Sequence, residues 1–479
     1  MDQKRIYLSA GIAAFIVLII YIWFISIGPW RIRGYTSDYY SQMASAFQHG
    51  QLALEAKPAP ALLALPNPYD PKARKNIPLL GDASLYKGKY YLYFGPLPSL
   101  PLALIADIFP IHAGDQIFVY VFLVGLFFLQ SLFFITLFRQ YFSSLPFWIV
   151  PSGILLLGVA GPYTRMLAHP FIHEAAISGG QVFSTAGLYF AFLALQNKPI
   201  NNRKLFIASV FWACSLATRI TQLLPISALV VVTLLFIMNE HRKAKLSWNF
   251  ASSTLALTAP LLFTGLLLGW YNWARFDSIS EFGLYYQLAA FNLQANYSAL
   301  FSRVYVVQNI YNYFLNPFEL RGSFPFVFPL PGSEKSILAA HELPRLYAVE
   351  GKFPGLLIST PLLIFSVLPL LLLTIKFIRS FGDTEIRSDL YNHFDWTVVS
   401  LSASFVAGSI PTLLLFYVGF RYETEFVSSL MLLGMIGFCQ GYMLFRNAMV
   451  RKFYTVIGAS LMVFSCAVNI ALALSGIRG

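Results

Sequence analysis

Long apolar stretches, repeated along the whole chain, constrain this sequence more than any other feature. A helix needs about 20 mostly apolar residues to cross the hydrocarbon core of a bilayer. The sequence offers eleven candidates, at residues 6–28, 116–138, 146–163, 175–195, 205–217, 221–238, 250–270, 355–377, 396–418, 426–445 and 453–475. We therefore predict an all-α polytopic membrane protein with about 11 transmembrane helices.

The composition agrees with a membrane protein and excludes several other classes. Hydrophobic residues make up 57% of the 479-residue chain and charged residues only 11%, against roughly 45–50% and 25% in ordinary soluble domains. A soluble enzyme, a disordered chain and a nucleic-acid-binding domain are excluded. The net charge of +12 is therefore interpreted as membrane sidedness, and the predicted partners include the lipid bilayer but no nucleic acid.

Basic residues predict the orientation, because short cytoplasmic loops are enriched in lysine and arginine. Lys4 and Arg5 place the N-terminus in the cytoplasm. Alternation of sides then makes every predicted cytoplasmic loop basic, at Arg139, at Lys198, Arg203 and Lys204, at Arg242, Lys243 and Lys245, at Lys376, Arg379 and Arg387, and at Arg446, Arg451 and Lys452. An odd number of spans puts the C-terminus on the periplasmic or external side of a plasma (inner) membrane.

One further apolar segment, residues 95–110, tests the span count. It is short and rich in proline. Counting it as a twelfth span would place the basic run at 241–245 outside, against the charge rule. We interpret it as a juxtamembrane or re-entrant helix, with twelve spans as the alternative.

Two long segments then face outward from a single domain that covers residues 1–479. The first, residues 29–115, contains an amphipathic helix near 37–55 and a strand-like run at 86–94. The second, residues 271–354, is rich in aromatic residues and has turn signals at FELRGSFP and PLPGSEK. We expect both loops to fold onto the outer membrane surface as a roof over a cavity.

The first outer loop supplies an acid close to the membrane. Asp38 follows the first span by ten residues, where partial desolvation would make its carboxylate a useful base. Tyr39 and Tyr40 beside it are suited to stacking on a sugar or to anchoring in the headgroup layer. The alternative is that Ser37 or Asp38 is simply the N-cap of the helix that follows.

A second acid and two lysines lie later in the same loop. Asp82 follows Gly81, and Lys87-Gly88-Lys89 has the pattern of a hairpin turn. One interpretation makes Asp82 a turn residue and Lys89 a solvated one. The other places Asp82 or Lys89 at an anionic site on the outer face.

His173 and Glu174 begin the fourth span on its outer side. Ionisable groups at a span end are costly against lipid, so we expect them to face an internal cavity. The alternative is a structural ion pair between Glu174 and Arg165, which precedes it.

Arginines recur at outer span ends, where the charge rule does not favour them. Arginine binds phosphate through a planar set of donors and keeps its charge, so a convergent set would hold a lipid-linked phosphate. The alternatives are snorkelling to headgroups or pairing with Glu423 and Glu425. The set consists of Arg165, Arg219, Arg275 and Arg421.

Taken together, these strings resemble the GT-C class of polytopic glycosyltransferases, in particular the bacterial relatives of protein O-mannosyltransferases and aminoarabinose transferases. The resemblance implies a sugar donor carried on a polyprenyl phosphate and transfer on the periplasmic face. It also implies that Asp38 matches the acid of the class's first loop, and that His173-Glu174 stands where relatives often have a second acid. The strings are TSDYY (36–40), DASLYKGKYYLYFGPLP (82–98), HEAA (173–176), LATR (216–219), YNWARFDSISEFGLYYQL (271–288) and RYETEF (421–426).

We therefore predict a glycosyltransferase that moves a hexosyl or pentosyl group to a hydroxyl on a glycan, lipid or protein, by a single inverting displacement. The predicted catalytic residues are Asp38, Glu174 and His173; the predicted phosphate-binding residues are Arg165, Arg219, Arg275, Arg421 and Lys89; the predicted substrate-lining residues are Tyr39, Tyr40, Asp82 and Tyr422. No cofactor is predicted and no Cys/His metal spacing occurs, while metal dependence is left open. The alternatives are a transporter or flippase of the cell-envelope glycan pathway and a non-catalytic scaffold.

Overall fold

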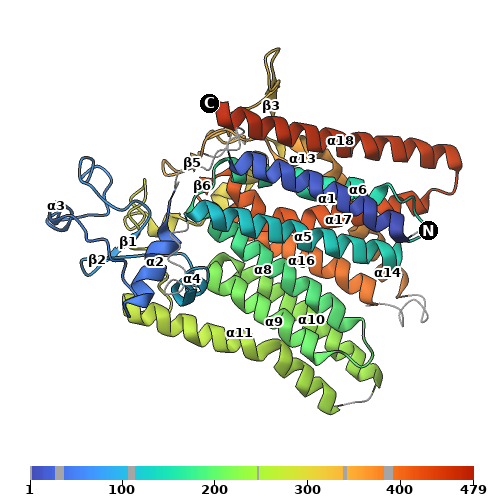
Figure 1. The fold of residues 1–479 in the computed structure, drawn as a ribbon, viewed down its shortest axis with the longest axis horizontal. Coiled ribbons are helices and arrows are strands. Elements are labelled where there is room, and N and C mark those ends of the chain that lie inside the picture. The colour runs from blue at the N-terminus through green and yellow to red at the C-terminus, as the bar shows by residue number, and fades with distance from the viewer. Residues whose placement is uncertain are drawn as a thin grey trace.

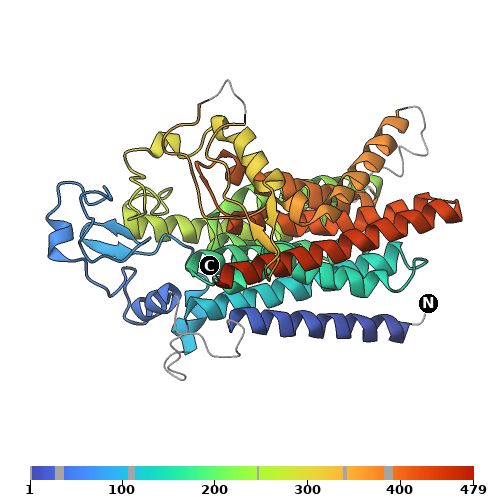
Figure 2. The ribbon, with the colours of Figure 1, turned by 90° about the horizontal axis from the view of Figure 1, so that it is seen from above.

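A computed structural model describes residues 3–26, 37–105, 114–244, 247–337, 342–381 and 392–478. Its long helices run side by side in one bundle (Figure 1), and the view from above shows the same alignment (Figure 2). The long helices are α1 (Gln3–Ile25), α5 (Asp115–Tyr141), α8 (Ile172–Leu195), α9 (Asn202–Thr218), α10 (Leu223–Ala244), α11 (Ser247–Phe276), α14 (Val367–Arg379), α16 (His393–Leu414), α17 (Thr424–Leu444) and α18 (Ala448–Arg478). The end of the first predicted span, the start of the first loop, Lys245 and Arg387 lie outside the described residues.

Every predicted span coincides with a helical region, but two of them are short. Within the described ranges, nine helical segments are long and apolar enough to cross a bilayer. The predicted span at 146–163 is instead α6 (Ile149–Val159), 11 residues long, followed by α7 (Tyr163–Ala168). Gly161, with a φ of +94°, and Pro162 interrupt the helix there. The span at 205–217 is α9, which has 17 residues.

The two chain ends lie at opposite ends of the bundle (Figure 1). Both long loops lie at the same end as the C-terminus (Figures 1 and 2), as an odd number of crossings requires. We call this the loop end of the bundle. Which compartment it faces stays a prediction from the charge pattern.

The first loop is built from short elements in the predicted order. They are α2 (Tyr39–Gln48), α3 (Pro60–Leu63), the antiparallel pair β1 (Ser84–Tyr86) and β2 (Lys89–Tyr91), and α4 (Ser99–Ile105). The hairpin turn at Lys87 and Gly88 is confirmed, with φ angles of +46° and +72°. At 7 residues, α4 is too short to span a membrane.

The second loop contains a hairpin where FELRGSFP predicted a turn, between β3 (Phe318–Leu320) and β4 (Val327–Pro329). Further on, β5 (Ala348–Val349) pairs in parallel with β6 (Tyr417–Val418) beside α17. The two loops also pair with each other, because the Leu85 amide donates to the Tyr286 carbonyl at 2.9 Å and the Leu288 amide to the Ala83 carbonyl at 2.9 Å. They therefore form one roof.

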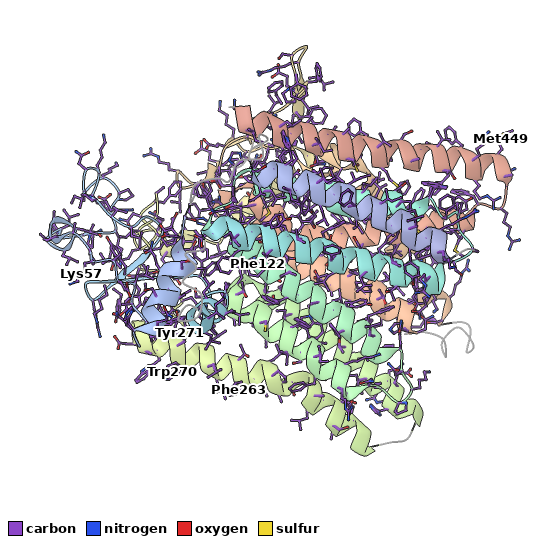
Figure 3. The ribbon with its side chains drawn as sticks, in the orientation of Figure 1. Lys57, Phe122, Phe263, Trp270, Tyr271 and Met449 are labelled. Atoms are coloured by element: carbon purple, nitrogen blue, oxygen red, sulfur yellow. The ribbon has the colours of Figure 1, made fainter. Side chains whose placement is uncertain are left out.

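Side chains on the outer side of α11 project away from the bundle, as Phe263 and Trp270 show (Figure 3). Their exposed fractions are 63% and 58%, as expected of residues that face lipid acyl chains. By contrast, Gly437 on α17 packs closely, since a Cβ there would lie 1.9 Å from the Phe365 carbonyl oxygen.

Candidate active site

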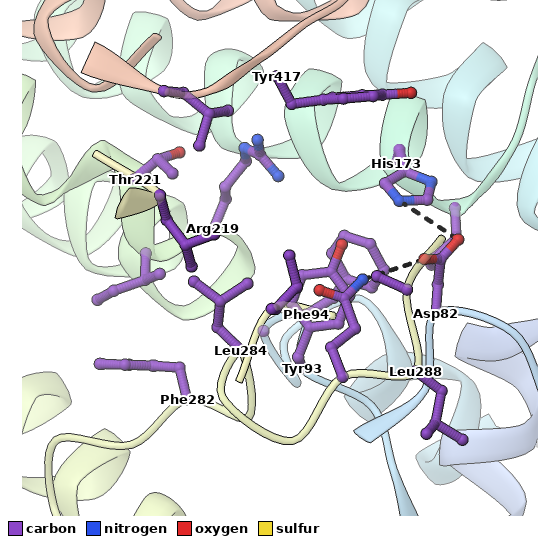
Figure 4. A pocket seen from close by; sticks show the side chains of 18 of the residues that line it. Asp82, Tyr93, Phe94, His173, Arg219, Thr221, Phe282, Leu284, Leu288 and Tyr417 are labelled. Carbon is purple, nitrogen blue, oxygen red and sulfur yellow. Dashed lines mark hydrogen bonds and ion pairs between the residues drawn. The ribbon is translucent and has the colours of Figure 1, made fainter. Parts of the chain in front are cut away.

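A cavity of about 1100 Å³ opens at the loop end, between the bundle and the roof made by the two loops. Figure 4 shows one part of it, with Asp82 and His173 on one wall and Arg219 on the other. The charged and ionisable residues that line the cavity are Arg74, Lys75, Asp82, His173, Arg219, Arg275, Glu281, Glu350, Arg421 and Glu425.

Asp82 and His173 meet at the cavity wall. His173 is the second residue of α8, and its Nε2 lies 3.8 Å from Asp82 Oδ2. The edge of Phe94 packs against the imidazole, with ring centroids 5.2 Å apart. On its other side, the Asp82 carboxylate accepts a hydrogen bond of 3.1 Å from the Gln287 side chain of the second loop. Groups from α8 and from both loops thus converge on one carboxylate.

The backbone at Asp82 has an unusual conformation. Its φ is +56°, in the left-handed region that aspartate and asparagine tolerate better than most residues. The Asp82 amide donates to the Leu288 carbonyl at 3.3 Å, so the pairing of the two loops holds this conformation. Burial raises the pKa of the Asp82 carboxyl, while the hydrogen bond from Gln287 and the charge of Arg421 oppose that rise.

Arg421 ties the second loop to the bundle. Its guanidinium makes a bidentate contact with Glu350, at 3.0 and 2.8 Å, which is a strong arrangement for arginine and carboxylate. It also lies 3.4 Å from Glu174. The alternative pairing of Arg165 with Glu174 is therefore wrong, because Glu174 faces Arg421. Glu174 is 1% exposed and supports Arg421 from behind the cavity wall.

Arg219 follows the C-terminus of α9 and lines the cavity. Its Nε donates to Glu425 Oε1. Thr221 and Gln222 also donate to the Glu425 carboxylate, at 3.1 and 2.6 Å. Pairing of an outer arginine with Glu425 was one of the alternatives from sequence, and it is confirmed here. Since the pair is itself part of the cavity wall, it orients Arg219 toward the cavity.

Arg275 also lines the cavity, but its donors are used within the protein. It bonds the Leu92 carbonyl at 2.7 Å, the Asn272 side chain at 2.8 Å and the Tyr271 carbonyl at 3.3 Å. Its guanidinium stacks on the Tyr271 ring at 3.8 Å. These contacts join α11 to the first loop, so the structure gives Arg275 a structural role.

The predicted base Asp38 is not among the residues that line the cavity. Its carboxylate accepts a 2.7 Å hydrogen bond from the Gln42 side chain. It is the N-cap residue of α2 but makes no capping bond of its own. Instead, Asp115 of α5 accepts from the Tyr39 and Tyr40 amides, at 3.0 and 3.2 Å. Asp38 thus occupies the expected N-cap position without a capping bond from its side chain, and its catalytic role stays a prediction.

The tyrosines differ in position. Tyr39 lines the cavity and donates to the Gly81 carbonyl at 2.5 Å; burial, followed by the charge of Asp82, raises its pKa to about 12. Tyr422 also lines the cavity. Tyr40 is fully buried against Phe118 and does not reach it.

Two predicted phosphate ligands lie elsewhere. Arg165, on α7, forms a buried ion pair with Glu423 at 3.0 Å and does not line the cavity. Lys89 is exposed on β2, also outside the cavity lining. Neither position supports a phosphate-binding role, because neither side chain has access to the cavity.

Sequence reasoning missed Glu350, Gln287 and Arg74 as cavity residues. No local signal distinguishes them, since each belongs to a polar loop and reaches the cavity only through the pairing of the loops. Among the described residues, no group of three or more His, Cys, Asp or Glu side chains is close enough to hold a metal ion.

The first loop docks on α9 through a close backbone contact at Gly95. The Gly95 amide donates to the Thr218 carbonyl at 3.1 Å, directly before Arg219. A Cβ at Gly95 would lie 2.1 Å from the Ala217 carbonyl oxygen. We predict that Gly95→Ala displaces the loop and abolishes ligand binding in the cavity. Gly322→Ala, where a Cβ meets nothing within 4 Å, is the control and should bind normally.

A second, apolar groove of about 690 Å³ lies between α9 and α11. It shares Pro96, Leu268 and Tyr271 with the polar cavity. The groove therefore adjoins the cavity at these three residues and is lined by membrane-facing helices. Its remaining lining is almost entirely apolar, including Phe206, Val210, Ala213, Ala217, Phe263 and Leu267.

No family model and no curated protein sequence matches this chain. Solved structures do match it. The apo oligosaccharyltransferase of Archaeoglobus fulgidus aligns over 98% of this chain and 57% of its own, with a TM-score of 0.50 and 13% sequence identity. A structure of the oligosaccharyltransferase AglB from Archaeoglobus fulgidus, in complex with an inhibitory peptide and a dolichol-phosphate, aligns over 98% of this chain and 56% of its own, with a TM-score of 0.49 and 12% identity.

This chain spans just over half the length of the oligosaccharyltransferase it matches. The match covers nearly the whole of this chain, and within it lie the apolar helices and the two loops described above. The predicted all-α, GT-C-like polytopic architecture is confirmed apart from the number of spans: the chain shares the fold of this oligosaccharyltransferase.

Proposed function

We propose that this protein is a glycosyltransferase that moves a sugar from a polyprenyl-phosphate carrier to a hydroxyl acceptor at the loop end of the bundle. The observation that carries the proposal is that two different spaces adjoin each other. A charged cavity and an apolar groove between α9 and α11 share three lining residues. A charged cavity beside an apolar groove suits an amphipathic donor, because its polar head can occupy the cavity and its hydrocarbon chain can occupy the groove. The GT-C fold supports this assignment.

Arg219 is the best-placed phosphate ligand in the cavity. It stands at the end of α9, the helix that also forms one side of the apolar groove. Glu425 accepts from its Nε, and Thr221 and Gln222 in turn donate to the Glu425 carboxylate. A phosphate bound at Arg219 would gain a charge-assisted contact in a partly dehydrated site, where such contacts are stronger than in water.

The proposed reaction is one inverting displacement on the external face of the membrane. The acceptor hydroxyl attacks the anomeric carbon and loses its proton to a carboxylate. The bond between that carbon and the phosphate oxygen breaks, and the polyprenyl phosphate leaves with the bonding electrons. Arg219 would stabilise the charge that develops on the leaving oxygen.

The proposal is tested with the purified protein in nanodiscs. Tritiated polyprenyl phosphate should bind, and mass spectrometry of cell-surface glycans should show a missing sugar when the gene is deleted. Binding together with carrier translocation but without sugar transfer would indicate a flippase instead. Failure to bind the carrier would refute the proposal.

A substitution in the groove tests where the hydrocarbon chain lies. Thr264 of α11 lines the groove, and Thr264→Trp should fill it. We expect about tenfold weaker binding of a long-chain polyprenyl phosphate and little change for a short-chain analogue. Leu266→Trp is the matched control, since Leu266 is 75% exposed on the same helix and does not line the groove. Equal binding by both variants would contradict this path.

A further inference from the structure

We propose that Asp82, held by His173 and Gln287, is the general base that activates the acceptor hydroxyl. This inference rests on the proposed function and assigns its proton acceptor. Asp38 is the acid that the family resemblance indicates for this part of the chain, so the structure points to a different residue. The assignment depends on the access of the carboxylate to the cavity, on the backbone that holds it in place and on the side chains that orient it.

Access separates the two acids. Asp82 lines the cavity, and 42% of its side chain is exposed there. Asp38 does not line the cavity, and the Gln42 side chain one turn further along α2 occupies its Oδ1 at 2.7 Å. A base must come within hydrogen-bond reach of the proton that it removes. Of these two acids, Asp82 meets this requirement without rearrangement of the first loop.

The fold holds Asp82 in place through a conformation that costs energy. Its φ of +56° is in the left-handed region, and strain of this kind persists only where the surrounding structure imposes it. Here the surroundings are the second loop, which pairs with Asp82 itself and with Ala83 and Leu85 after it, through Leu288 and Tyr286. If Asp82 were only a turn residue, its conformation would not require pairing with a loop about 200 positions away in sequence.

Two side chains orient the carboxylate. Gln287 is 6% exposed and donates to Oδ1 at 3.1 Å. His173 Nε2 lies 3.8 Å from Oδ2, on the opposite side, and Figure 4 shows both contacts converging on Asp82. We assign His173 and Gln287 as positioning residues. The His173 contact is longer than a hydrogen bond, as is common at sites without substrate.

The charges around Asp82 support the same role. Burial raises the pKa of its carboxyl, which makes the carboxylate a stronger base. Arg421 and Arg74 lower that pKa, as does the Gln287 hydrogen bond, while Glu350 raises it. His173 of α8, Tyr39 of α2 and Tyr93 of the first loop also face Asp82.

Asp82 Oδ accepts the proton of the acceptor O–H while that oxygen forms a bond to the anomeric carbon. The anomeric carbon–phosphate oxygen bond breaks, and the leaving phosphate keeps its electron pair beside Arg219. The Asp82 proton then passes to water through the open side of the cavity.

The decisive experiment compares Asp82→Asn with Asp277→Asn. Asparagine tolerates the left-handed conformation and its carbonyl can accept the Gln287 bond, so only basicity is removed. We expect the transfer rate to fall by about 10²–10⁴-fold, with unchanged polyprenyl-phosphate binding and unchanged melting temperature. Asp277 has a φ of +55° and lies outside the cavity lining, so Asp277→Asn should retain full activity.

Each outcome has a distinct meaning. If the wild-type protein binds the carrier and transfers sugar but Asp82→Asn does so at a normal rate, this inference is overturned and the proposed function stands. If Asp38→Asn loses transfer while Asp82→Asn keeps it, Asp38 is the base. If the wild-type protein neither binds nor transfers, the proposed function itself fails.

The pH dependence of the transfer rate provides a test that does not depend on unfolding of the protein. A base with a raised pKa loses activity as the pH falls through that value, at a higher pH than an ordinary aspartate would. Gln287→Met removes a hydrogen bond that lowers the Asp82 pKa. We expect the acidic limb of the rate profile to move to higher pH in this variant. A shift to lower pH, or no shift, would contradict the assignment.

Discussion

Replacing Arg219 with glutamine is expected to slow sugar transfer by about 10²–10³-fold, the range found when one preorganised donor to a developing negative charge is removed. Arg219 lines the cavity at the end of α9, opposite Asp82 and His173 (Figure 4). The Thr221 and Gln222 side chains would still donate to Glu425. Since Glu425 would nevertheless lose its buried ion-pair partner, the melting temperature of the variant is measured together with its transfer rate.

Measurements of carrier binding and of turnover report different parts of the effect of replacing Arg219. Arg219→Gln should weaken binding of polyprenyl phosphate and reduce turnover further, because the leaving phosphate gains negative charge in the transition state. Arg219→Lys should recover only part of the rate, since an ammonium cannot form the planar two-donor contact. Arg303→Gln, an exposed arginine outside the cavity, is the control. Turnover close to wild type in Arg219→Gln would remove Arg219 from the leaving-group site.

The second large effect concerns stability. Arg165 and Glu423 form a buried ion pair at 3.0 Å, with side-chain exposures of 8% and 0%. Replacing Arg165 with methionine would leave the Glu423 charge buried and unpaired, which costs about 3–5 kcal/mol. We expect Arg165→Met to lower the unfolding free energy by that amount, measured by denaturant unfolding in mild detergent.

A double substitution separates charge from packing. In Arg165→Met with Glu423→Leu, no charge remains buried, so most of the lost stability should return. Because neither side chain lines the cavity, the double variant should also bind the carrier normally. A double variant that is stable but does not bind the carrier would restore the sequence-based prediction that Arg165 is a phosphate ligand.

Several of the residues that the sequence predicted for the site line the cavity, but their partners could not be predicted from the sequence. Arg165, Arg219 and Arg421 were all expected at one end of the bundle. Each instead pairs with a glutamate, Arg165 with Glu423, Arg219 with Glu425 and Arg421 with Glu350 and Glu174. Pairing with Glu423 and Glu425 was among the alternatives, whereas Glu350 carries no local signal because it reaches Arg421 from a distant loop.

The two acids of the first loop also show that contacts between distant segments cannot be predicted from the sequence. Asp38 and Asp82 both stand beside aromatic residues in polar segments of the sequence. Whether either carboxylate reaches the cavity depends on the pairing of residues 83–85 with 286–288 and on the capping of α2 by Asp115. These are contacts between segments far apart in the chain, and no spacing within one loop encodes them.

The sequence by itself determined the helical membrane architecture, the short elements of the first loop and the gathering of charge at span ends. These follow from local properties, since the length and hydropathy of a segment decide whether it can enter a bilayer. Only the tertiary structure decided which arginine faces open space, which acid lines the cavity, and that an apolar groove adjoins it. Those features depend on how desolvated charges find partners across the fold, because a buried charge without a partner is too costly to remain.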